Sequence, residues 1–118
     1  MNTTIFRQVV DTNDAYLRRF THEYPKVFAK FTADHCALCT ELAPCFARFA
    51  DEPANKDILF VRLSAAENPV AQQLLVKRDA PFFVSYCQGR LIECDVLATE
   101  AEVLAQLARL RDFSPTPR

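Results

Sequence analysis

Residues 26–44 read KVFAKFTADHCALCTELAP, and this stretch decides the fold. Its first part, residues 26–31, is a short apolar run typical of a buried strand. The segment that begins at Cys36 carries apolar side chains at helical spacing and predicts a helix to about Asp51. These side chains are Leu38, Leu42, Cys45, Phe46 and Phe49. A strand is therefore expected to run almost directly into a helix, with Cys36 and Cys39 at the junction.

The rest of the chain continues this alternation in both directions. Before the central stretch, residues 5–10 predict an edge strand, and Asp11, Thr12 or Asn13 can cap a helix that ends near Thr21. After it, the expected elements are a strand at 58–63, a helix at 68–76, strands at 81–87 and 91–96, and a helix opened by the capping box Thr99–Glu102. Gly89, the single glycine, lies in the turn between the last two strands, where a positive φ is expected.

The predicted order is β-α-β-α-β-α-β-β-α, which places the chain in the α/β class. Continuous apolar strands fit a parallel sheet covered on both faces, and the late hairpin adds antiparallel pairing. We therefore expect a central mixed β-sheet flanked by helices. At 118 residues the chain has room for one domain, which we place at residues 1–113, with residues 114–118 as a flexible C-terminal tail.

The composition is that of an ordinary globular protein. Hydrophobic residues make up 50% of the chain, charged residues 25%, and the formal net charge is -1. This balance gives no electrostatic reason to expect nucleic acid or an anionic membrane surface as a partner. No signal peptide is predicted at the first residues, and no apolar stretch reaches the length of a membrane span. The sequence therefore predicts a cytoplasmic protein.

Five cysteines stand at positions 36, 39, 45, 87 and 94. An odd count in a chain that can build its own core argues against a secreted disulfide framework. In a reducing compartment, two cysteines three residues apart indicate redox or metal chemistry. We interpret Cys45, Cys87 and Cys94 as small buried hydrophobes, with a regulatory disulfide between Cys87 and Cys94 as the less favoured alternative.

The position of Cys36 and Cys39 has a chemical consequence. A helix N-terminus carries a partial positive charge and unpaired N–H groups, which stabilise a thiolate over a thiol. The thiolate is the attacking species in disulfide exchange, so Cys36 is the candidate nucleophile. Cys39 lies most of one helical turn further on, close enough to form a ring with Cys36. The pair thus predicts a dithiol that cycles to a disulfide.

The same spacing also occurs in zinc sites, and two other functions stay open. A zinc ribbon needs a second pair of ligands, which this sequence lacks, so a redox dithiol is favoured and no metal or cofactor is predicted. In the first alternative, Cys36 and Cys39, with or without His35, hold zinc or an iron–sulfur cluster shared across a dimer. In the second, the domain is a scaffold that binds partners without turnover.

Residues 6–110 resemble the thioredoxin family. The similarity rests on residues 31–44, which match the family's strand, C-x-x-C motif and helix with a proline five residues after the second cysteine. Residues 67–69, Ala80-Pro81 and Gln88-Gly89 match further family landmarks. The resemblance implies the thioredoxin fold, thiol–disulfide oxidoreductase activity on protein disulfides without a cofactor, and an external reductase or dithiol donor as partner.

The resemblance also implies roles for individual residues. Cys36 corresponds to the family's nucleophile, and Cys39 to the thiol that resolves the mixed disulfide. Pro81 corresponds to the family's cis-proline, and Ala80 would offer backbone hydrogen bonds to an extended substrate. The alternative for Pro81 is a trans proline at the start of an edge strand.

Two departures from the family pattern concern the motif itself. The chain has no tryptophan, and His35 stands where the family has one before the first cysteine. His35 is either a solvated neighbour or a group that lowers the pKa of Cys36 by a hydrogen bond or charge. Ala37 and Leu38 replace Gly-Pro between the cysteines, which should change the reduction potential. Both are candidate substrate contacts, and Leu38 alternatively belongs to the core.

A third departure lies beneath the motif. The family usually buries an acid six residues before the first cysteine, but Lys30 holds that position here, and Arg62 is the matching residue on the next strand. Two unpaired buried cations are untenable. Lys30 must therefore lose its proton, extend to solvent or pair with a carboxylate, unless the strand register turns it outward. We expect Lys30 to favour the Cys36 thiolate and to make the disulfide more oxidising.

Overall fold

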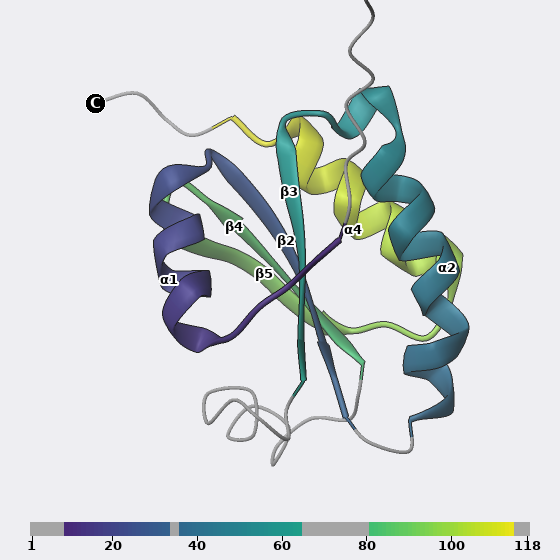
Figure 1. Cartoon of the computed structure of the whole chain (residues 1–118). Coiled ribbons are helices and arrows are strands. Elements are labelled where there is room, and N and C mark those ends of the chain that lie inside the picture. Colours follow the sequence, from purple (N-terminus) through teal and green to yellow (C-terminus); the bar gives the residue numbers. More distant parts are fainter. Residues whose placement is uncertain (1–8, 34–35, 65–80, 115–118) are drawn as a thin grey trace, which may run out of the picture.

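The computed structural model of the chain describes residues 9–33, 36–64 and 81–114 (Figure 1). The elements are β1 Val10–Asp11, α1 Asp14–Glu23, β2 Lys26–Thr32, α2 Ala37–Asp51, the 3-10 turn η1 Pro53–Asn55, β3 Ile58–Ser64, β4 Phe82–Cys87, β5 Arg90–Val96 and α4 Glu100–Asp112. The helix expected at residues 68–76 lies outside the described residues. Within the described ranges no helix is long and apolar enough to cross a membrane.

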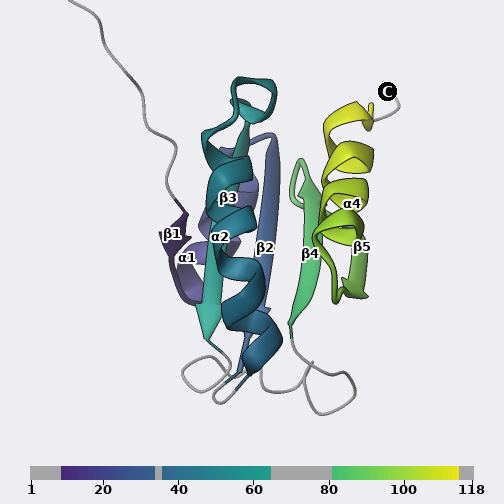
Figure 2. The same ribbon diagram turned by 90° about the vertical axis from the view of Figure 1, so that its right-hand side faces the viewer.

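The strands form one five-stranded mixed sheet in the order β1-β3-β2-β4-β5. β2 runs parallel to β3 and antiparallel to β4, so it is the central strand. In this register Lys30 stands between Arg62 of β3 and Phe83 of β4. α2 and α4 lie on one side of the sheet, and α1 lies on the other, as comparison of the two views shows (Figure 2). The predicted α/β class and mixed sheet are confirmed.

Phenylalanines fill the core between the sheet and helices α2 and α4. Phe46 of α2 packs against Phe28, Phe60 and Phe83 of the sheet, with ring centroids 5.3–5.8 Å apart. Such tilted and edge-to-face pairs add to the stabilisation from burial alone. A second core on the α1 side is closed by stacked Phe31 and Phe82, whose centroids are 4.7 Å apart. These two cores fix β2, and with it the strand end that leads to the cysteines.

Hydrogen bonds at the helix N-termini explain where the helices begin. The Asn13 side chain accepts the backbone N–H of Tyr16 at 3.0 Å and caps α1. The capping box at α4 is confirmed, because Thr99 accepts from the backbone N–H of Glu102 and the Glu102 carboxylate accepts from the backbone N–H of Thr99. Each cap satisfies N–H groups that have no partner within the helix.

The N-terminal strand is described only in part. Its described part is Val10–Asp11, which pairs in parallel with β3. Of the strand predicted at residues 5–10, Val10 is confirmed, Val9 is not in a strand, and residues 5–8 lie outside the described residues. Asp11 is therefore a strand residue and not a helix cap. The physical reason is that its carboxylate pairs with Arg62 across the sheet, which a sequence pattern does not show. Helix α1 also runs to Glu23, two residues beyond the expected end at Thr21.

The turn between β4 and β5 contains two consecutive residues with positive φ. Gln88 has φ 53° and Gly89 has φ 83°, as the expectation for this glycine requires. Two positive φ values are typical of the hairpin turns whose twist matches that of the strands. A Cβ atom at Gly89 would also lie 3.0 Å from Nδ1 of His22, so both conformation and space favour glycine here.

Candidate active site

The two cysteines of the C-x-x-C motif lie at the N-terminus of α2, near the carboxyl end of β2. Cys36 is the N-cap residue of α2, and its Sγ accepts the backbone N–H of Cys39 at 3.0 Å. Cys36 and Cys39 form a disulfide, with their Cα atoms 5.2 Å apart. Cys39 is 7% exposed, whereas Cys36 is more accessible. The more exposed cysteine is therefore the one at the helix tip, where unpaired N–H groups stabilise a thiolate.

An open depression of about 760 Å³ borders the disulfide. Its walls come from the end of β2, the first two turns of α2 and the neighbouring strand β3. The lining residues are Lys30, Thr32, Ala33, Cys36, Ala37, Cys39, Thr40, Ala43 and Arg62. Five of these were predicted site residues, so the fold brings together the motif and both cations of the sequence analysis. The other four, Thr32, Ala33, Thr40 and Ala43, were missed, because their residue types carry no chemical signal of their own.

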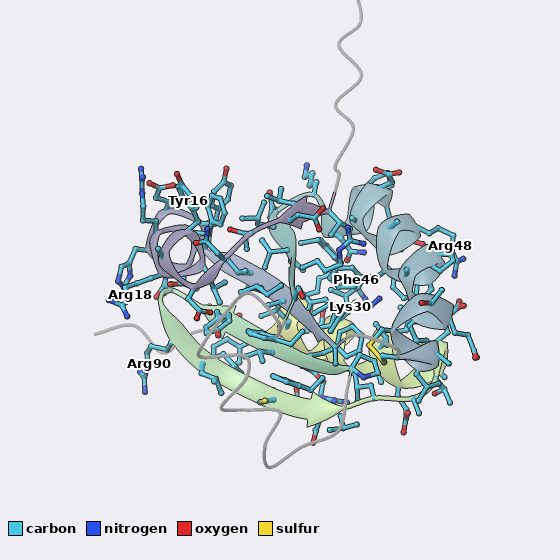
Figure 3. All side chains as sticks on the ribbon, turned by 60° about the horizontal axis from the view of Figure 1, so that its bottom comes forward. Tyr16, Arg18, Lys30, Phe46, Arg48 and Arg90 are labelled. Carbon is cyan, nitrogen blue, oxygen red and sulfur yellow. A yellow bond between two sulfur atoms is a disulfide. The ribbon has the colours of Figure 1, made fainter. Side chains whose placement is uncertain are left out.

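Lys30 is a buried basic residue directly beneath the C-x-x-C motif. It is 1% exposed, and its Nζ donates a hydrogen bond to the backbone carbonyl of Cys39 at 2.7 Å. The same Nζ lies 5.7 Å from the centroid of the Phe46 ring, and Figure 3 shows the two side chains close together. The register therefore directs Lys30 into the core, and its side chain does not extend to solvent.

Burial changes the ionisation of this amine. The pKa of Lys30 falls from 10.5 to about 8, first because burial disfavours the ammonium and second because the Arg62 guanidinium repels it. The thiol of Cys45 acts in the opposite direction, and burial raises the pKa of that thiol. In the ion pairs formed by the described residues, Lys30 has no carboxylate partner. Burial therefore shifts Lys30 in the direction of the first expected solution, loss of the proton, but with a pKa of about 8 the amine still carries its proton at neutral pH.

Arg62 occupies a different environment at the mouth of the depression. Its side chain is 42% exposed, and both Nε and a terminal nitrogen lie 2.6 Å from Oδ1 of Asp11. The two cations are thus not equivalent: among the described residues Lys30 is buried with no acid beside it, whereas Arg62 is partly exposed and paired with Asp11. Asp11 was missed as a site residue, since its pairing depends on the β1–β3 register.

A model of the thioredoxin family matches residues 7–109 of the chain. The chain belongs to the thioredoxin family. At the level of the family, this membership and the C-x-x-C disulfide support a thiol–disulfide oxidoreductase. No curated protein matches the sequence.

Solved thioredoxin structures share the fold at low sequence identity. A Malassezia sympodialis thioredoxin is 22% identical with a TM-score of 0.78, and the match covers 93% of this chain and 97% of that one. A single-site mutant thioredoxin from Halobacterium salinarum is 21% identical with a TM-score of 0.78, covering 97% and 100%. Spinach chloroplast thioredoxin f is 19% identical with a TM-score of 0.79, covering 95% and 100%. These likenesses confirm the thioredoxin fold of this family member.

Of the remaining predicted residues of this thioredoxin-family site, some lie within the described ranges and others do not. Ala37 is exposed and lines the depression, Leu38 is half-buried, and Pro81 is buried with its carbonyl accepting the backbone N–H of Leu97 at 3.4 Å. His35 and Ala80 lie outside the described residues, as do residues 67–69. The cis geometry of the bond before Pro81 stays a prediction.

The other three cysteines lie away from the depression. Cys45 and Cys87 are 4% and 3% exposed, which confirms them as small buried residues. Cys94 is only half-buried on β5, so that part of the expectation was wrong; its strand is at the edge of the sheet and leaves its side chain partly open. Cys94 stands opposite Val84, and Cys87 opposite Arg90, so the hairpin does not place the two cysteines face to face.

Proposed function

We propose that this chain exchanges disulfides with other proteins, with Cys36 as the nucleophile and Cys39 as the resolving thiol. The observation that carries the proposal is the Cys36–Cys39 disulfide at the tip of α2, with the more exposed cysteine at the N-cap. The α2 N-terminus lowers the energy of a Cys36 thiolate, which is the attacking species in thiol–disulfide exchange.

The reaction proceeds in two steps that balance in electrons and protons. The Cys36 thiolate attacks one sulfur of a substrate disulfide, forms the mixed disulfide and releases the other substrate sulfur as a thiolate, which takes a proton from water. Cys39 then loses its proton and attacks Cys36, which breaks the mixed disulfide and releases the second substrate thiol. Two electrons have passed from the dithiol to the substrate. An external reductase or dithiol donor returns them, and no cofactor takes part.

The charges beneath the motif are proposed to shift the reduction potential of the cysteine pair. Lys30 carries a positive charge below a pH of about 8, and no carboxylate is among the residues that line the depression within the described chain. A cation near the sulfurs favours thiolates and therefore the reduced form, so the disulfide should be more oxidising than it would be above an acid. Replacing Lys30 with Asp should lower the reduction potential and raise the pKa of Cys36. Unchanged values for both would contradict this role.

Four residues around the motif are proposed to contact the substrate. The exposed Ala37 and the half-buried Leu38 are the proposed contacts at the helix tip, and Ala80 and Pro81 are the proposed docking edge for an extended peptide. His35 is proposed to tune the Cys36 thiolate. A cytoplasmic location fits a dithiol that must be kept reduced.

Trapping the mixed disulfide tests the two cysteine roles. We expect Cys39→Ser to accumulate a stable mixed disulfide with a protein disulfide substrate, because the attack by Cys36 proceeds and resolution is lost. Cys36→Ser should give none, and the control Cys94→Ser should turn over like the unaltered chain. Mass spectrometry of the adducts under non-reducing conditions identifies the bonded cysteine. Adducts on Cys36→Ser, or none on Cys39→Ser, would overturn the proposed roles.

A further inference from the structure

A second depression, of about 460 Å³, lies at the end of the sheet opposite to the disulfide. We call it the distal depression, and six of the residues that line it are Tyr24, Lys26, Lys56, Ile58, Leu59 and Arg111. In Figure 1, β3 begins and α4 ends at the top of the view, whereas α2 begins at the bottom. The seven residues of β2 connect the two ends of the sheet and span about 20 Å at about 3.3 Å per residue. The distal depression is therefore separate from the cysteine site.

The floor of the distal depression is apolar. Ile58 is 2% exposed and Leu59 is half-buried at the start of β3. Tyr24 lines the depression from the α1–β2 connection, and its ring packs edge-on against Phe20 with the centroids 6.0 Å apart. Small-molecule sites are mostly apolar hollows of about 300–1,000 Å³. The volume and the floor thus fit the body of a small organic molecule.

Basic side chains outnumber acidic ones around this floor. Lys26, Lys56 and Arg111 line the distal depression together with one acid, Asp57. Asp112 lies 4.0 Å from Nε of Arg111, but its side chain is 79% exposed, so water weakens this contact. Lys56 takes part in none of the ion pairs formed by the described residues. The distal depression therefore combines an apolar floor with an excess of positive charge.

Hydrogen bonds hold two of these bases in place. Nζ of Lys26 donates to the backbone carbonyl of Arg111 at 2.8 Å, and Nη1 of Arg111 donates to Oδ1 of Asn55 at 3.1 Å. Asn55 is fully buried, and its Nδ2 donates to the carbonyl of Phe49 at 2.9 Å. A lysine has three N–H donors and an arginine five, so both bases keep donors for a further partner. Side chains that are already ordered lose less conformational entropy when a ligand binds.

We propose that the distal depression binds a small organic anion with a flat apolar body and one acidic group, such as an aromatic carboxylate. The body packs against Ile58, Leu59 and Tyr24, and the acidic group contacts Lys56 and Arg111. The apolar floor supplies attraction for the body, while the basic rim selects an anion over a neutral or cationic molecule of the same shape. This binding is a property beyond the proposed disulfide exchange, because the two sites lie at opposite ends of β2.

The test is a nuclear magnetic resonance titration of the ¹⁵N-labelled chain in its disulfide form. The probe is biphenyl-4-carboxylate, and biphenyl-4-methanol is its neutral counterpart with the same apolar body. We expect saturable shifts of the amide signals of Lys56, Ile58, Leu59 and Arg111. The carboxylate should bind at least about fivefold more tightly than the alcohol, since two partly exposed ion pairs contribute a factor of this size. Shifts that do not saturate, shifts centred on other residues, or equal affinities for the two probes would overturn the proposal.

Substitutions separate the rim from the overall charge of the chain. Lys56→Glu should weaken carboxylate binding at least about fivefold and leave alcohol binding unchanged, because it replaces an attraction with a repulsion. Arg18→Glu is the matched control: Arg18 is exposed on α1, and its replacement changes the net charge equally (Figure 3). It should alter the affinity by less than about twofold, as expected for a partly screened distant charge. Equal weakening by both variants, or an unchanged affinity in Lys56→Glu, would overturn the proposal.

Two more variants test the floor and the independence of the site. Tyr24→Ala should weaken the binding of both probes by a similar factor, because it removes apolar contact surface that they share. Cys36→Ser should bind the carboxylate like the unaltered chain, so a failure of the proposed disulfide exchange would leave this result intact. Normal binding of both probes in Tyr24→Ala, or lost binding in Cys36→Ser, would contradict the assigned site.

Discussion

Replacing Lys30 with methionine should stabilise the oxidised protein at neutral pH. The pKa of Lys30 falls from 10.5 to about 8 on folding. At about 1.4 kcal/mol for each unit of pKa, this difference destabilises the folded state by about 3 kcal/mol when the lysine is protonated in the unfolded chain. Methionine fills a similar volume without a charge. We therefore expect the free energy of unfolding of Lys30→Met to exceed that of the unaltered chain by about 2–3 kcal/mol at pH 7.

The pH dependence of this gain follows from proton binding. Between pH 8 and 10.5 the unfolded chain holds a proton on Lys30 that the folded chain has released, so the unaltered protein gains stability as pH rises. Below pH 8 both states are protonated, and the full penalty of burial is present. The advantage of Lys30→Met should thus be largest below pH 8 and shrink steadily toward pH 10.

Urea unfolding of the disulfide forms at pH 7, 8, 9 and 10 measures both effects. Lys56→Met is the matched control, because Lys56 is exposed and its replacement should change stability by no more than about 0.5 kcal/mol at any of these pH values. A gap between Lys30→Met and the unaltered chain that stays constant with pH would refute the reasoning. A loss of stability in Lys30→Met at pH 7 would refute it as well.

Three further changes probe the structure around the site. Arg62→Gln removes the second cause of the lowered pKa of Lys30, so the pH-dependent rise in stability should move to higher pH in urea titrations. Gly89→Ala forces a side chain into a backbone with φ 83° and toward His22, and should lower the free energy of unfolding by about 1–2 kcal/mol. Thr99→Ala removes the N-cap of α4 and should lower it by about 1 kcal/mol, while an unchanged melting curve would contradict the role of the cap.

Much of the fold was predictable because its signals are local. The strand of residues 26–31, the helix after Cys36 and the capping box at Thr99 depend on runs, spacing and caps that lie within a few residues of each other. The limits of elements were less predictable, because they depend on pairing between distant segments. The apolar run ending at Val10 predicted an edge strand, but the inclusion of Asp11 depends on its pairing with β3, which no local pattern encodes.

The residues of the site could likewise be identified in part from the sequence, whereas their contacts could not. The C-x-x-C spacing identified Cys36 and Cys39, and the resemblance to the thioredoxin family drew attention to Lys30 and Arg62, which occupy positions beneath the family's motif. The sequence did not show which of the two cations is buried or what each one contacts. The carbonyl of Cys39 as the partner of Lys30 and Asp11 as the partner of Arg62 emerge only from the packing of α2 and the edge strand against the sheet.

Cys36 and Cys39 are proposed to form a working dithiol couple. The most direct test is the fraction of the pair that is reduced after equilibration in graded glutathione or dithiothreitol buffers, measured by alkylation and mass spectrometry. We predict one reversible two-electron transition with a midpoint within about −270 to −120 mV, the range of redox-active disulfides of this kind. Thiols that stay in one state across all the buffers would contradict the account.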